Sequence, residues 1–159
     1  MNSKLDLHLR QIYLDEYLKI AVDDKLRFIL VEWLRHVTGE KFREHFRKAA
    51  NFATALKSEY WLSDARAIHY LEFADQNWLI REMAPLLQKT KLVKFARLTT
   101  IESLSLLDAT QVYGKLEKLT HLKIKTALEL FTDKNVALDW LFSDVDIIKY
   151  HNTKIKDSS

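Results

Sequence analysis

The sequence predicts an α/β fold: a mixed sheet of four to five strands with about four helices. Two kinds of segment follow one another along the chain. In the first, apolar and polar residues alternate as they do in strands, and in the second, apolar residues recur at helical spacing. Only two Gly and one Pro occur among 159 residues, too few turn formers for an all-β fold. We expect a single domain over residues 1–148, followed by a polar, disordered tail over residues 149–159.

The N-terminal part predicts a hairpin. Residues 17–22 alternate, and Asp23-Asp24-Lys25 suits a tight reversal because Asp tolerates turn geometry. Residues 26–34 carry apolar groups on both faces, as expected for a central strand. Residues 8–14 are a further, weakly patterned candidate strand.

A helix and a buried strand follow the hairpin. Thr38-Gly39-Glu40 starts the helix, with Thr38 as the expected N-cap, and the apolar spacing continues to about Lys57. Tyr60–Asp64 is a short buried strand that ends in a carboxylate. A strand, a helix of this length and another strand predict a crossover between parallel strands.

The second half continues the alternation of helices and strands. The expected elements are a connection over 65–74, a helix capped by Asp75 that Pro85 should kink or end, a strand over 92–98, a helix from Thr100 or Ser103 through Leu116, a strand over 122–130 near a sheet edge, and a last helix capped by Asp133.

Composition excludes several kinds of site. The chain has no Cys, so disulfides, thiolate zinc sites and a Cys nucleophile are absent. No P-loop, dinucleotide fingerprint or nucleophile elbow occurs, and no His pair has metalloprotease spacing. The net charge of +3 is small, so we expect no nucleic-acid partner. The polar N-terminus predicts no signal peptide, and the longest apolar run, Phe28–Val31, predicts no membrane span.

Several short motifs occur in a characteristic order over residues 17–142. They are a strand ending in Trp33, the helix start Thr38-Gly39-Glu40, Tyr60-Trp61-Leu62-Ser63-Asp64 with Arg66, Asp75-Gln76-Asn77-Trp78-Leu79 with Pro85, Lys94-Phe95-Ala96, and Phe131-Thr132-Asp133 with Ala137-Leu138-Asp139-Trp140-Leu141. Together they resemble the bacterial STAS/SpoIIAA-like family. The resemblance implies a mixed sheet with helices largely on one side. It also implies a relationship to protein-binding regulators of anti-sigma factors and to lipid-binding domains.

One departure from that family concerns its phosphate switch. Its regulatory members carry a phosphorylatable Ser or Thr at the start of the helix after the central strand. Residues 65–75 of this chain contain neither. Ser63 precedes them, but it lies inside the expected strand. The resemblance is therefore to a branch without the phosphate switch.

Six residues at and after the central strand are candidates for contact with a partner: Asp64, Arg66, His69, Glu72, Asp75 and Trp78. Each group also has a structural interpretation. Asp64 can bond loop N–H groups or pair with Arg66, and Trp78 at helical spacing can belong to the core. His69 and Glu72 are loop residues first and candidate general bases second.

The sequence thus predicts a small cytoplasmic, non-enzymatic regulatory module that binds a protein, without cofactor or metal. Homodimers could form through the N-terminal strands at a sheet edge. The alternative is a carrier of a small apolar or lipid-like ligand, in a cavity lined by Phe42, Phe46, Trp61, Trp78 and Trp140. An enzyme would need Asp64, His69 and Glu72 to converge in a cleft.

Overall fold

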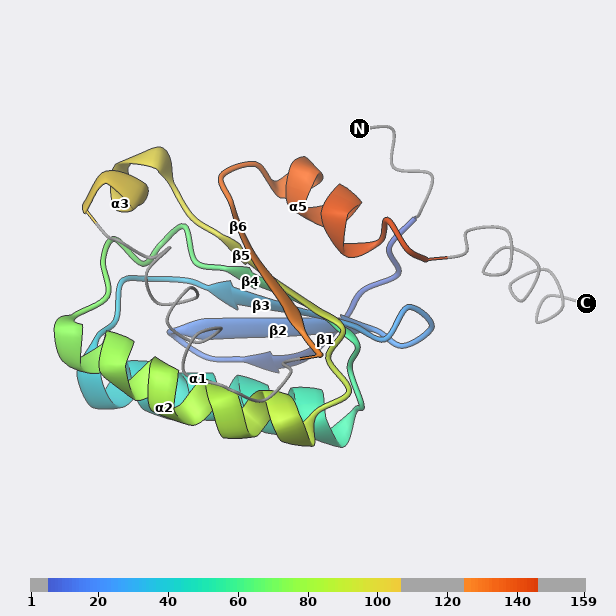
Figure 1. The fold of residues 1–159 in the computed structure, drawn as a ribbon, viewed down its shortest axis with the longest axis horizontal. Coiled ribbons are helices and arrows are strands. Elements are labelled where there is room, and N and C mark those ends of the chain that lie inside the picture. The colour runs from blue at the N-terminus through green and yellow to red at the C-terminus, as the bar shows by residue number, and fades with distance from the viewer. Residues whose placement is uncertain (1–5, 107–124, 146–159) are drawn as a thin grey trace, which may run out of the picture.

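A computed structural model describes residues 6–106 and 125–145 (Figure 1). The described residues form one sheet of six strands in the order of the sequence. The strands are β1 (Arg10–Leu14), β2 (Leu18–Asp23), β3 (Phe28–Trp33), β4 (Tyr60–Asp64), β5 (Lys94–Leu98) and β6 (Ala127–Phe131). The described helices are α1 (Gly39–Ala55), α2 (Phe73–Lys89), α3 (Ile101–Leu106) and α5 (Lys134–Leu141).

The sheet is mixed, as predicted. β1, β2 and β3 pair antiparallel, whereas β3, β4, β5 and β6 pair parallel. The hairpin turns where expected, because the Asp23 carboxylate accepts the backbone N–H groups of Lys25 and Leu26 at 3.1 Å each. β6 is an edge strand, as its pattern indicated.

The expected number of four to five strands is too low, because the weakly patterned segment 8–14 contains β1. β1 is the other edge of the sheet, and its residues are exposed or half-buried. Its pairing with β2 is irregular between Gln11 and Tyr13. An edge strand with an irregular register loses the strict alternation by which a strand is found in a sequence.

Helices cover both faces of the sheet, and not largely one (Figure 1). α1 and α2 pack on the face that carries Val31, Trp61 and Phe95. α5 packs on the opposite face, against Leu62 and Leu98. The parallel strands are apolar on both faces, so each face needs a cover.

The beginnings of α1 and α2 differ from expectation. Thr38 is at the N-cap position of α1, but its side chain makes no capping hydrogen bond. α2 begins at Phe73, so Asp75 lies inside its first turn and is not its cap. The carboxylate of Asp75 instead accepts the N–H of Gly39, at the start of α1, at 2.9 Å.

Pro85 neither ends α2 nor divides it, because the helix continues to Lys89. Pro removes one backbone hydrogen bond from a helix interior, which weakens the helix there. Met83 and Leu87, on either side of Pro85, are both buried in the core under α1 and α2. Their burial keeps the helix against the core on both sides of Pro85.

Caps at the later helices agree with the sequence. Asp133 accepts the N–H of Val136 at 3.0 Å and so caps α5. Thr100 accepts the N–H of Ser103 at 3.1 Å at the start of α3. Expectations for residues 107–124 and for the tail lie outside the described residues. Among the described helices, none is long and apolar enough to cross a membrane.

Candidate functional site

The candidate site begins at the end of β4, where Asp64 and Arg66 form an ion pair. The Asp64 carboxylate is buried, and it accepts hydrogen bonds from Arg66 Nε at 2.9 Å and Nη2 at 2.8 Å. The hydrogen bond from Arg66 to Asp64 raises the pKa of the guanidinium, against the opposing effect of burial. The geometry matches the structural interpretation of Asp64: its charge is neutralised by a near neighbour in the sequence.

His69 is held by a second histidine and not by Asp64. Its backbone N–H donates to Nδ1 of His36 at 3.1 Å, and the two rings stack with centroids 5.2 Å apart. The ring of Tyr70 lies 4.6 Å from that of His36. In the described part of the chain, no hydrogen bond or ion pair joins Asp64, His69 and Glu72.

This contact makes the loop sensitive to acid. Burial lowers the pKa of His36, the charge of His69 lowers it further, and the charge of Glu72 opposes the change. A lowered pKa in the folded state gives stability that is present above the unfolded value of about 6.5 and is lost as the pH falls. Protonation also removes the lone pair that accepts the His69 N–H.

We expect hydrogen exchange at the His69 amide, corrected for its intrinsic pH dependence, to accelerate as the pH falls from 7.5 to 5.5. The control is His36→Asn, whose side-chain oxygen can accept the same hydrogen bond and does not titrate. In that variant the corrected rate should stay constant. Equal acceleration in both proteins would show that protonation of His36 is not the cause.

Asp75 and Trp78, two of the candidate partner residues, are buried at 1% and 4% exposure. The Asp75 carboxylate joins two helices: it accepts the N–H of Gly39 and, at 3.1 Å, Nε of Arg43. Trp78 contacts the edges of Phe42 and Phe46, with ring centroids 6.3 and 5.8 Å away. Neither side chain is accessible at the surface, because both are packed between α1 and α2.

Three exposed side chains of this region, Tyr70, Glu72 and Phe73, form what we call the loop surface, and the candidates Arg66 and His69 are exposed beside it. Phe73 is 75% exposed and Tyr70 is 44% exposed. The start of α3 lies beside the same loop, since Ser103 Oγ donates to the carbonyl of Ile68 at 3.4 Å. The sequence reasoning missed Phe73, although an aromatic residue just before the apolar stripe of a helix is a detectable signal.

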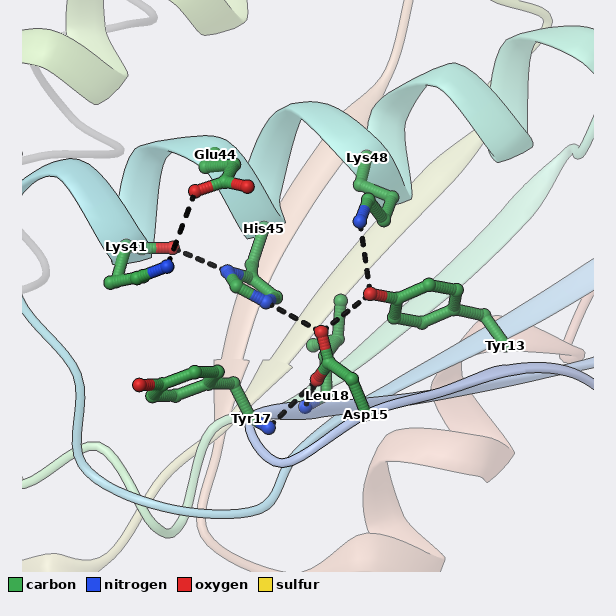
Figure 2. Close-up of polar contacts among 8 residues, drawn as sticks. All are labelled: Tyr13, Asp15, Tyr17, Leu18, Lys41, Glu44, His45 and Lys48. Carbon is green, nitrogen blue, oxygen red and sulfur yellow. Dashed lines mark hydrogen bonds and ion pairs between the residues drawn. The ribbon is translucent and has the colours of Figure 1, made fainter.

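A second polar cluster was not found from the sequence. It is centred on Asp15, in the turn between β1 and β2 (Figure 2). One carboxylate oxygen accepts the N–H groups of Tyr17 and Leu18, at 2.7 and 2.8 Å. The other accepts the Tyr13 hydroxyl and bonds Nε2 of His45 at 2.7 Å.

These hydrogen bonds control the charge of Asp15. Burial raises its pKa, but the hydrogen bonds from Tyr13, Tyr17, His45 and Leu18 outweigh burial and hold the pKa well below its usual range. Nδ1 of His45 faces the carbonyl of Lys41 at 2.6 Å. Both ring nitrogens of His45 thus lie within hydrogen-bond distance of an oxygen atom.

The Asp15 cluster joins the β1–β2 turn to α1. Lys48, also on α1, donates to the Tyr13 hydroxyl at 2.9 Å (Figure 2). Both oxygens of the Asp15 carboxylate are bonded by its own neighbours. In the described ranges, no three His, Asp or Glu side chains come together in a way that could hold a metal ion.

Between the sheet and helices α1 and α2 lies a cavity of about 10 Å³. Phe42 and Phe46 line it, as the carrier alternative expects. Trp61 instead fills space between Phe46 and Phe95, with ring centroids 5.8 and 5.1 Å away. Trp140 lies on α5, where its ring is 5.4 Å from that of Phe131. A second hollow, of about 170 Å³, lies over β1, β2 and β3 and is lined by residues that include Lys19 and Glu32.

No family model matches the sequence, and no curated protein matches it. Among solved structures, the chain is similar to an uncharacterised protein of the DUF3478 family from Shewanella loihica PV-4, described as having a SpoIIAA-like fold. The two chains are 15% identical, and the alignment covers 89% of this chain and 98% of the other, with a TM-score of 0.46. The description of this neighbour uses the same fold name as the resemblance stated from the sequence motifs.

Proposed function

We propose that this chain is a non-enzymatic interaction module that binds a protein partner through the loop surface of Tyr70, Glu72 and Phe73. The observation that carries the proposal is the 75% exposure of Phe73, beside Tyr70 at 44%. Aromatic side chains are enriched in protein interfaces, where they bury large areas at little cost in conformational entropy.

The loop surface is held in place from both sides. The Asp64–Arg66 pair and the contact of His69 with His36 order the loop. Asp75 ties the first turn of α2 to α1. A surface that is ordered before binding loses less conformational entropy when a partner docks.

Capture of partners from a native extract tests the proposal. The double variant Tyr70→Ser, Phe73→Ser should lose the captured proteins, because it removes the apolar contact and leaves the core intact. The matched control is Val136→Ser on α5, which removes a side chain that is 53% exposed elsewhere on the molecule. If both variants capture the same proteins as the parent, the loop surface is not the binding site.

The two other hypotheses from the sequence, a carrier of an apolar ligand and an enzyme, have less support. A carrier of a lipid-like ligand needs a pocket of about 300 Å³ or more, and the cavity under α1 and α2 has about 10 Å³. An enzyme needs convergent polar groups, whereas Asp64 is paired with Arg66 and His69 with His36. Self-association through the N-terminal strands stays a prediction, and the irregular register of β1 disfavours long pairing at that edge.

A further inference from the structure

One end of the sheet brings together four stretches of the chain, residues 25–27, 54–59, 86–93 and 125–127. The carbonyl of Arg27 accepts the N–H of Glu59 at 2.8 Å. The carbonyl of Glu59 accepts the N–H of Val93 at 2.7 Å, and that of Val93 accepts the N–H of Ala127 at 2.9 Å. These residues form a row across the starts of β3, β4, β5 and β6, and α1 and α2 end on the same side (Figure 1).

Basic side chains follow this row. Lys57, Lys91 and Lys125 each lie two residues before a member of the row, and all three are exposed. Arg27 belongs to the row itself, and its side chain is 53% exposed. Lys89, the last residue of α2, is exposed as well. We call these five residues the basic end.

Little negative charge opposes the basic end. Glu59 is the one acidic residue in the four stretches, and it pairs with Arg27 at 3.3 Å. Asp24, next to the first stretch, pairs with Arg10 at 2.7 Å. The segments of the chain outside the described ranges each contain more Lys than Asp and Glu together, so they add no net negative charge. The resulting positive field attracts an anionic partner.

Two of the five basic residues occupy a backbone conformation that favours glycine. Arg27 and Lys57 have φ angles of 52° and 54°, and among the described residues no other side chain lies in this left-handed region. A residue with a Cβ atom is strained there, whereas Gly is not. Backbone geometry therefore does not explain a basic side chain at either position. Strain of this kind is concentrated at functional sites.

The neighbours of the lysines favour a lipid surface over a nucleic acid. Leu56 and Val93, in the same stretches, are 37% and 38% exposed. The four stretches contain no aromatic residue on which a base could stack. Lysines beside exposed aliphatic side chains suit a membrane surface, where the charges meet anionic headgroups and the apolar groups enter the interface.

We propose that the basic end docks the protein onto a membrane surface that carries anionic phospholipids. The loop surface follows the opposite end of β4, which ends at Asp64. A partner held at the loop surface therefore leaves the basic end accessible to the bilayer. Membrane docking does not depend on that partner, so each proposal can fail without the other.

Co-sedimentation of the purified protein with vesicles tests the docking. One set of vesicles contains phosphatidylserine and phosphatidylcholine in equal parts, and the other contains phosphatidylcholine alone. The protein should sediment with the first set and not with the second. Added salt should release it, because salt screens exposed charges. The variant Leu56→Ser, Val93→Ser should bind the mixed vesicles more weakly than the parent does.

The variant Lys57→Gly, Lys91→Gln separates loss of charge from loss of fold, because Gly suits the left-handed backbone at position 57. Its affinity for the mixed vesicles should fall about fivefold for each lysine removed. The matched control is Lys41→Gln, Arg81→Gln, which removes the same charge from exposed positions elsewhere on α1 and α2 and should bind as the parent does.

Four results would each overturn the proposal. The first is that the parent protein does not distinguish the two sets of vesicles. The second is that the variant at Lys57 and Lys91 binds as the parent does, and the third is that the control loses as much affinity as this variant. The fourth is that a mixed-sequence DNA oligonucleotide is bound while the mixed vesicles are not, which would assign the basic end to nucleic acid.

Discussion

Replacing Asp75 with alanine is expected to lower the free energy of unfolding by about 3 kcal/mol, the scale found when one partner of a buried ion pair is removed. The carboxylate is 1% exposed and serves two helices. Its loss leaves the Gly39 N–H at the start of α1 without an acceptor, and it leaves the guanidinium of Arg43, whose side chain is 25% exposed, without its counter-charge. Urea denaturation at pH 7 measures the change.

The control for Asp75 is Asp133, another aspartate that caps a helix. Asp133 is exposed and accepts one N–H, from Val136. Asp133→Ala should therefore cost about 1 kcal/mol, as an ordinary N-cap does. If Asp75→Ala costs no more than Asp133→Ala, the link between α1 and α2 does not hold the fold together.

The elements found correctly from the sequence are those whose pattern is local. Tyr60–Asp64 matches β4 residue for residue, because it is short, apolar on both faces and bounded by a polar turn. The caps of Asp133 and Thr100 were also found, since each acceptor lies three residues from its donor. The parallel crossover followed from the length of the helix between two strands.

The missed features depend on contacts between distant residues. The sequence predicts that Asp75 caps its own helix, but its carboxylate accepts the N–H of Gly39, 36 residues away. α2 continues beyond Pro85, and there Met83 and Leu87 pack against core residues from distant parts of the sequence. β1 was weakly patterned because all its residues are exposed or half-buried and its register with β2 shifts between Gln11 and Tyr13.

The candidate site was predicted in part for the same reason. Asp64 and Arg66 are two residues apart, and their pairing was foreseen as an alternative to a binding role. The Asp15–His45 contact spans 30 residues and has no sequence motif.

Asp15→Asn should lower the free energy of unfolding at pH 7 by about 3 kcal/mol, because several hydrogen bonds to a charged acceptor are weakened together. The amide keeps one oxygen for the N–H groups of Tyr17 and Leu18. It places an NH₂ group where the carboxylate accepted from Tyr13 and His45. The neutral amide attracts the Tyr13 hydroxyl and the His45 ring less strongly than the carboxylate does, so the attachment of the β1–β2 turn to α1 weakens.

The pH dependence of this difference identifies its cause. The pKa of Asp15 is lower in the folded protein than in the unfolded chain, so ionised Asp15 stabilises the fold at pH values above about 3.9 and loses this effect as the pH falls below it. The gap between the parent and Asp15→Asn should therefore be full at pH 6 to 7 and narrow at pH 3, in urea denaturation at each pH.

Asp24→Asn is the control for this last experiment. Asp24 also has a lowered pKa, chiefly through its hydrogen bond with Arg10, but its side chain is 60% exposed. Water screens an exposed pair, so this variant should change stability little at any pH. A gap for Asp15→Asn that stays constant from pH 7 to pH 3 would mean that the turn is held by shape and not by the charge of Asp15.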